Sequence, residues 1–81
     1  MRFAERVRRW AGRVIGQMDM IRNLETAGSL GSRAAMRRLR EIEADASQPG
    51  VVRTAAQAAW RRARSIRYLY DMGPADADDA D

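Results

Sequence analysis

The chain contains no cysteine, no histidine and no lysine. Without cysteine it has no disulfide framework and no thiolate chemistry, which fits the reducing cytoplasm where we expect the protein to work. Without histidine it lacks the commonest general base and the commonest metal ligand, and without lysine it cannot form a Schiff base. We therefore expect no enzymatic activity, no cofactor, no metal site and no small-molecule substrate.

Long apolar runs are also absent. No stretch approaches the roughly 20 apolar residues that a membrane-spanning helix needs. The basic segment MRFAERVRRW has no apolar centre of the kind found in a secretory signal. We expect no membrane among the partners of this protein.

All 15 basic residues are arginine, whose planar guanidinium suits bidentate contact with phosphate and stacking on aromatic rings. Residues 1–70 carry these 15 arginines and six acids, a net charge of +9, whereas residues 71–81 carry five aspartates and no base, a net charge of −5. GC-rich codon usage also favours arginine over lysine, but it does not decide where the arginines stand. The basic body predicts a polyanionic partner, for which the acidic tail could compete.

Apolar residues recur at helical spacing in three segments, over residues 2–25, 33–46 and 51–72. Glycine, serine and proline separate these segments at residues 27–32 and 47–50, and Ser32 is a predicted N-cap. We therefore predict an all-α fold, a three-helix antiparallel bundle over residues 1–74, followed by a disordered acidic tail over residues 75–81. The first segment has its apolar residues on one face: Phe3, Val7, Trp10, Val14, Met18 and Ile21.

This bundle should be only marginally stable by itself. The second predicted helix is too short to cover its neighbours, and the third presents mostly alanine to the core, which contributes little transfer free energy. We expect Trp10 in the core, and exposed apolar surface near Val14, Met18 and Ile66. An apolar surface of this kind predicts self-association or docking onto a larger subunit.

Arginines recur along one face of each predicted helix, almost without acids between them. The candidate nucleic-acid-binding residues on these faces are Arg2, Arg6, Arg9, Arg13, Arg33, Arg37, Arg40, Arg53, Arg64 and Arg67. The alternative is that they form ordinary solvated faces, although such faces usually mix charges of both signs. The scarcity of acids favours contact with phosphates.

Trp60 stands among Arg53, Arg64 and Arg67 on the predicted third helix. A tryptophan flanked by arginines suits base stacking with phosphate contacts on either side, so Trp60 is also a candidate nucleic-acid-binding residue. Two alternatives stay open. Trp60 could cover the edge of the core with Arg64 stacked on it, or it could anchor a protein–protein contact.

Residues 30–39 read LGSRAAMRRL. This stretch resembles the G-x-R-A-x-L-R-R stretch near the start of the small subunit of CRISPR Cascade-type effector complexes. The resemblance implies an all-helical, basic subunit of an antiviral ribonucleoprotein that contacts nucleic-acid backbone without reading sequence. It adds Arg38 to Arg33 and Arg37 as binding positions. The chain is shorter than most of that family and would lack its C-terminal helical part.

The sequence thus predicts a non-enzymatic subunit that binds the backbone of RNA or single-stranded DNA within a larger complex. The alternative is a small protein-interaction module, such as a phage-encoded inhibitor or adaptor, whose arginines meet an acidic protein surface.

Overall fold

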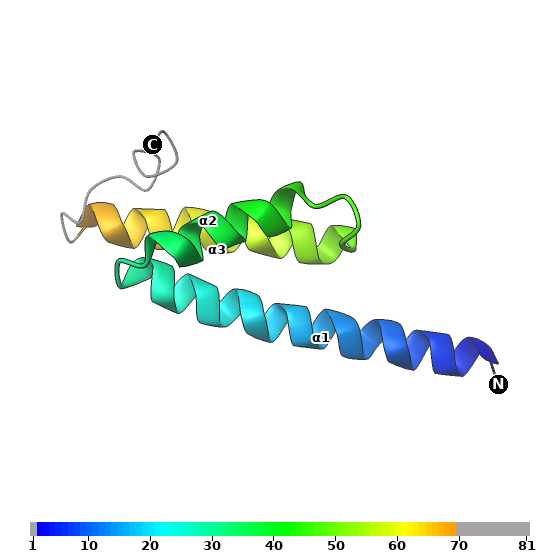
Figure 1. The fold of residues 1–81 in the computed structure, drawn as a ribbon. Helices are drawn as coiled ribbons and strands as arrows, with labels where there is room; N and C mark the ends of the chain where they lie inside the picture. Colours follow the sequence, from blue (N-terminus) through cyan, green and yellow to red (C-terminus); the bar gives the residue numbers. More distant parts are fainter. Residues whose placement is uncertain (1, 70–81) are drawn as a thin grey trace.

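The structure, a computed structural model, describes residues 2–69, and all three segments predicted to be helical form helices there. They are α1 (Arg2–Ser29), α2 (Arg33–Ala44) and α3 (Gly50–Leu69), successive helices run antiparallel, and each contacts the other two (Figure 1). The predicted three-helix antiparallel bundle is confirmed for this part of the chain. The predicted tail (75–81) and the predicted end of the third helix (70–72) lie outside the described residues.

The turn between α1 and α2 reverses the chain within three residues. Gly31 adopts a left-handed conformation with φ 112°. Its N–H donates to the carbonyl of Gly28 (3.1 Å), and the N–H of Ser32 donates to that of Ala27 (3.0 Å), which is the Schellman pattern of helix termination. Ser32 then caps α2, as predicted, because its hydroxyl accepts a hydrogen bond from the Ala35 N–H (3.1 Å). The first helix therefore continues four residues beyond its predicted end at Glu25.

The second helix ends two residues earlier than predicted, at Ala44. The carboxylate of Asp45 accepts hydrogen bonds from both the N–H (2.9 Å) and the hydroxyl (2.6 Å) of Ser47. This local turn offers the backbone an alternative to helix, so the chain leaves α2 at Asp45. Those same bonds, the hydroxyl bond first, lower the pKa of Asp45.

The core lies where the three helices meet. Its buried side chains are Ile21, Met36, Leu39, Ile42, Val52, Ala56, Ala59 and Ala63. The alanines of α3 allow close helix approach, and Gly28 of α1 comes closest: a Cβ placed there would lie 2.5 Å from the Met36 sulfur. Val14 and Met18, which we expected at an exposed surface, are instead partly buried against this core. Ile66 is exposed, as expected.

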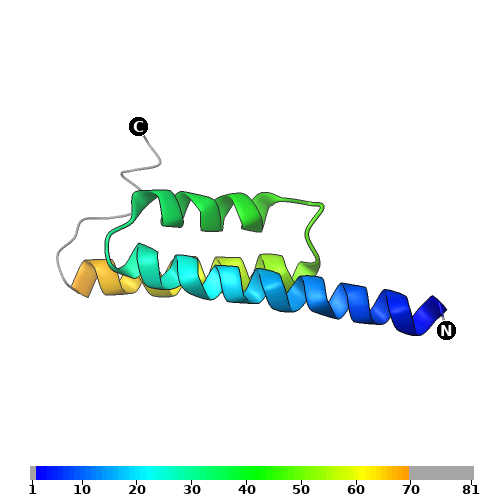
Figure 2. The same cartoon turned by 60° about the horizontal axis from the view of Figure 1, so that its bottom comes forward.

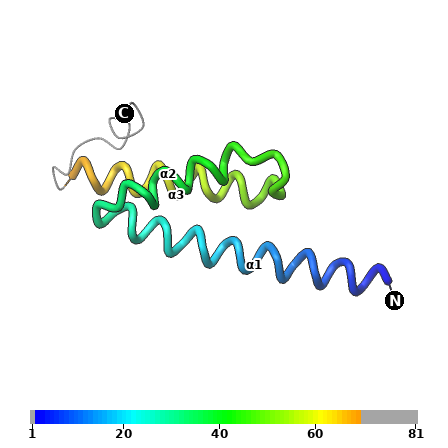
Figure 3. The backbone as a smooth tube through the Cα atoms, in the orientation of Figure 1, coloured from blue at the N-terminus to red at the C-terminus, as the bar shows by residue number. Residues whose placement is uncertain are grey.

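The first helix is much longer than its neighbours. At a rise of about 1.5 Å per residue, α1 measures roughly 42 Å, whereas α2 measures roughly 18 Å and α3 roughly 30 Å. Its beginning therefore extends past the loop that joins α2 and α3, as three drawings show (Figures 1, 2 and 3). Residues 2–10 are all exposed. Residues 2–13 are called the arm below. No helix among the described residues has the length and apolarity needed to cross a membrane.

Candidate nucleic-acid interface

The arm carries a row of exposed arginines. Arg2, Arg6, Arg9 and Arg13 recur at steps of four, three and four, so they follow one face of α1, and all four are exposed. One acid stands nearby: Glu5 Oε2 lies 3.9 Å from Arg9 Nη2, with 65% and 77% of the two side chains exposed. A pair so open to solvent is weak, so the guanidinium groups of this face can exchange it for a phosphate.

A second set of exposed arginines lies on α2. Arg33, Arg37 and Arg40 follow the side opposite the buried residues Leu39 and Ile42, as the sequence predicted. Arg38, the position added by the resemblance, is also exposed, and its Nη1 lies 3.2 Å from Glu41.

Arg40 of this second set belongs to a cluster of stacked side chains that joins α2 to α3, here called the arginine–aromatic cluster: Arg40, Trp60, Arg64 and Tyr68. The guanidinium carbons of Arg40 and Arg64 lie 5.0 and 5.4 Å from the centre of the Trp60 ring. Arg64 also lies 5.3 Å from the centre of the Tyr68 ring, and its Nη2 donates to the Tyr68 hydroxyl (3.3 Å). The predicted cation–π pair of Trp60 and Arg64 is therefore present, and a second arginine, from α2, joins it.

Trp60 itself is partly buried and packs against the core. Beside it lies an open hollow of about 740 Å³, lined by Trp60, Arg61, Arg64, Ser65 and Tyr68. A second hollow of about 600 Å³ lies between the end of α2 and the start of α3, with Arg40, Glu43 and Arg53 among its lining residues. Arginine side chains line both hollows, and the second hollow is also lined by Glu43.

The placement of Arg67 corrects the sequence prediction. We expected it on a solvent-facing side of α3 with Trp60, but its side chain is buried, at 4% exposed. Its Nη1 donates to the carbonyl of Gly28 in the last turn of α1 (3.4 Å). The guanidinium faces the negative end of that helix, where a cation is favoured, and is not presented to an external phosphate.

Arg53 is used in a similar way at the other end of α3. It is partly buried, and its Nε donates to the carbonyl of Glu43 (2.9 Å). Glu43 is in the last turn of α2. Since this donor satisfies a carbonyl at the C-terminus of α2, Arg53 also belongs to the packing of the bundle. Of the predicted arginines of α3, Arg64 belongs to the arginine–aromatic cluster and lines the hollow beside Trp60.

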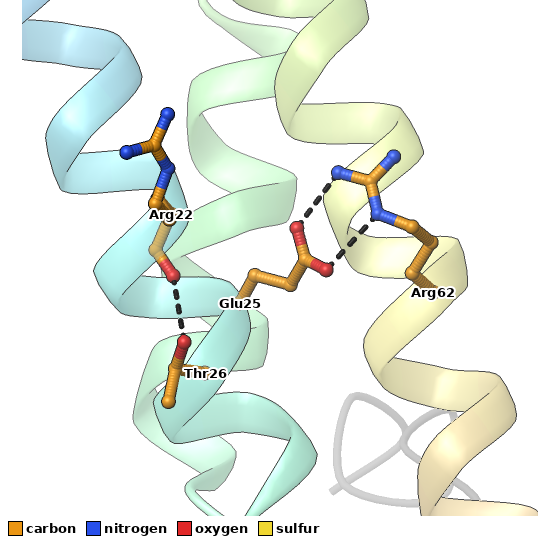
Figure 4. Close-up of polar contacts among 4 residues, drawn as sticks. All are labelled: Arg22, Glu25, Thr26 and Arg62. Atoms are coloured by element: carbon orange, nitrogen blue, oxygen red, sulfur yellow. Dashed lines mark hydrogen bonds and ion pairs between the residues drawn. The ribbon is translucent and has the colours of Figure 1, made fainter.

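An ion pair that sequence reasoning missed joins α1 to α3. Arg62 Nη2 and Nε donate to the two carboxylate oxygens of Glu25 at 2.7 and 3.0 Å (Figure 4). These hydrogen bonds, more than the Coulombic attraction, lower the pKa of Glu25 and raise that of Arg62. The residues lie 37 positions apart, so no local spacing signals the pair.

The exposure of Trp10 also corrects the sequence prediction. It was predicted in the core, yet 51% of it is exposed, and the beginning of α1 extends past the loop that joins α2 and α3. Phe3 (78%) and Val7 (47%) are exposed as well. The helical period correctly put these residues on one face, but periodicity does not say whether a neighbouring helix extends far enough to cover it.

Among the described residues no group of three or more His, Cys, Asp or Glu side chains could hold a metal ion. Comparison of the chain with protein-family models, curated proteins and solved structures gives no match.

Proposed function

We propose that this protein is a non-enzymatic subunit that binds nucleic-acid backbone, independently of sequence, within a larger complex. The observation that carries the proposal is the exposed arginine face of the arm, formed by Arg2, Arg6, Arg9 and Arg13. Arg53, Arg62 and Arg67 have partners inside the bundle. Among the described residues, the arginines of the arm face have one weak ion pair, that of Arg9 with Glu5. Guanidinium groups so placed can contact successive phosphates without reading base edges.

The arginines of α2 form a second basic surface, which begins at the opposite end of α1 from the arm. Arg33, Arg37 and Arg38 are exposed at the start of that helix. Their resemblance to the small subunits of CRISPR Cascade-type complexes supports an antiviral ribonucleoprotein as the setting. The cation-lined hollow beside Trp60 and Arg64 offers a further phosphate position.

The second candidate function is a protein-interaction module. Phe3, Val7 and Trp10 are exposed at i, i+4 and i+7, the spacing by which an amphipathic helix fills an apolar groove of a partner. The flanking arginines would then meet acidic residues on the rim of that groove.

Salt-dependent binding tests the nucleic-acid function. Affinity for a labelled oligothymidylate strand is measured by fluorescence anisotropy at several salt concentrations. Because phosphate contacts release counterions, log K should fall linearly with log salt, and the slope should shrink by about 0.7 for each contact removed from a single strand. Arg6→Gln and Arg13→Gln should each show this reduction. Arg62→Gln, which removes an equal charge from a group already paired with Glu25, is the matched control and should change the slope less.

No binding at low salt would refute the nucleic-acid function and favour the protein-interaction module. Equal slopes for Arg6→Gln, Arg13→Gln and Arg62→Gln would show that net charge, not the arm, governs binding.

A further inference from the structure

The arm has an aromatic side as well as an arginine side. Phe3 and Trp10 are seven residues apart on α1, which is two helical turns, or roughly 10.5 Å along the axis. Both rings are exposed, and neither has a cation–π contact within the described part of the chain. Two rings this exposed on the same helix, Phe3 at 78% and Trp10 at 51%, indicate a contact site.

Each ring has arginines as its neighbours along the helix. Arg6 follows Phe3 by three residues and precedes Trp10 by four, and Arg13 follows Trp10 by three. Side chains three or four residues apart adjoin on a helix surface, with about 5–6 Å between their Cβ atoms. The aromatic and arginine faces therefore run side by side along the arm.

We infer that the arm binds single-stranded nucleic acid by stacking unpaired bases on Phe3 and Trp10 while the neighbouring arginines hold the phosphates. This inference rests on the proposed function and specifies its ligand. In a duplex the faces of the bases are covered by their neighbours, so the two rings would gain nothing from it. In a single strand the bases turn out from the backbone, and every base offers a face to stack on, which gives binding without sequence preference.

Trp10 of the arm is a better candidate for base stacking than Trp60, the residue suggested by the sequence. The Trp60 ring already has the guanidinium groups of Arg40 and Arg64 against it, at 5.0 and 5.4 Å, and packs on the core. A base stacking on this ring would compete with those cations. Trp10 has no such cation against its ring among the described residues.

Charge also argues against a second copy as the occupant of this face. The arm holds five arginines and one glutamate, a net charge of +4. Two arms packed along their apolar faces would bring two such charges together, whereas a polyanion neutralises them. Charge complementarity therefore favours a strand over a second arm.

The test uses the full chain and three probes: an oligothymidylate strand, its duplex with oligodeoxyadenylate, and inorganic polyphosphate. In a Trp60→Phe background, fluorescence reports Trp10 alone. The strand should quench this fluorescence, whereas polyphosphate, which has no bases, should bind without quenching it and the duplex should quench it weakly. Trp10→Ala should weaken binding of the strand roughly 5- to 150-fold, because stacking of one base is lost.

Matched variants separate stacking from simple apolar contact. Trp10→Phe should retain most of the affinity, since it keeps a ring, and Phe3→Ala should lose affinity as Trp10→Ala does. Val7 is exposed on the same face but has no ring, so Val7→Ala should leave strand binding unchanged. Circular dichroism of each variant checks that the helices are intact.

The outcomes distinguish this inference from the proposed function. If strand and polyphosphate bind equally and Trp10→Ala changes nothing, stacking is wrong and backbone binding stands. If none of the three probes binds, the proposed function fails as well. Equal losses of strand affinity in Phe3→Ala, Val7→Ala and Trp10→Ala would overturn stacking in favour of simple apolar contact. Trp10 fluorescence that responds to phosphatidylserine vesicles but not to the strand would overturn it in favour of a lipid surface.

Discussion

Arg67 Nη1 donates to the carbonyl oxygen of Gly28 across 3.4 Å, joining the end of α3 to the last turn of α1. The last four carbonyls of a helix have no partner within it, and those in a buried turn need donors from elsewhere. Gly28 is buried, and its carbonyl already accepts the N–H of Gly31 (3.1 Å) within the turn, so Arg67 supplies a second, charged donor to it. The contact links α3 to α1 and gives the buried guanidinium one hydrogen bond within the packed region.

Truncation of Arg67 should therefore reduce stability. We expect Arg67→Ala to lower the free energy of unfolding by about 2–4 kcal/mol, because it removes a charged donor and leaves a cavity. Arg67→Met, which fills the space without burying a charge, should lie within about 1 kcal/mol of the unsubstituted protein. Urea unfolding followed by circular dichroism measures both. An unchanged midpoint in Arg67→Ala would contradict the role given to this contact.

The close approach of α1 and α2 makes a second prediction. A Cβ at Gly28 would lie 2.5 Å from the sulfur of the buried Met36, so Gly28→Ala should destabilise the protein by about 1–2 kcal/mol in spite of the better helix propensity of alanine. Gly16 lies on the same helix with nothing within 4 Å of the equivalent atom. Gly16→Ala should thus stabilise by about 0.5–1 kcal/mol. Thermal unfolding of the two variants should shift in opposite directions.

The ion pair of Glu25 and Arg62 predicts a dependence of stability on pH. The pKa of Glu25 is lowered from 4.5 in the folded protein, so its contribution is present above pH 4.5 and is lost as pH falls through the lower, folded value. Arg62 is largely exposed, with 59% of its side chain open to solvent, which limits the pair to about 0.5–1 kcal/mol. Glu25→Gln should lower the free energy of unfolding by this amount at pH 7. It should lower it little at a pH below the folded pKa of Glu25.

A double-mutant cycle isolates that pair. The pKa of Asp45 is also lowered, so stability lost at acid pH can come from Asp45 as well as from Glu25. The pH dependence of the free energy of unfolding therefore does not by itself assign the effect to Glu25. The coupling energy between Glu25→Gln and Arg62→Gln should fall as pH drops below 4.5. A coupling that does not change with pH would mean that Glu25 contributes through packing and not through its charge.

The sequence predicted the fold better than the site, for physical reasons that differ from residue to residue. Ser32 and the glycine turn could be predicted because caps and left-handed glycines are local chemistry. Leu39 and Ile42 could be predicted as core because the helical period defines a face. The exposure of Trp10 could not, since it depends on how far α2 and α3 extend beside α1. The burial of Arg67 could not be predicted either, because the residue it contacts, Gly28, lies 39 positions away in the sequence.

The two tryptophans should differ in their contribution to stability, which checks this division between bundle and arm. Trp60 packs against the core beneath two guanidinium groups, so Trp60→Ala should lower the free energy of unfolding by about 2–4 kcal/mol. Trp10 is 51% exposed, so Trp10→Ala should change the free energy of unfolding by less than about 0.5 kcal/mol. Urea unfolding monitored by circular dichroism suits both variants, since it does not rely on the residue removed. A large loss of stability in Trp10→Ala at low protein concentration would show that the arm is covered in solution, and equal losses in both variants would contradict the assignment of Trp60 to the core edge.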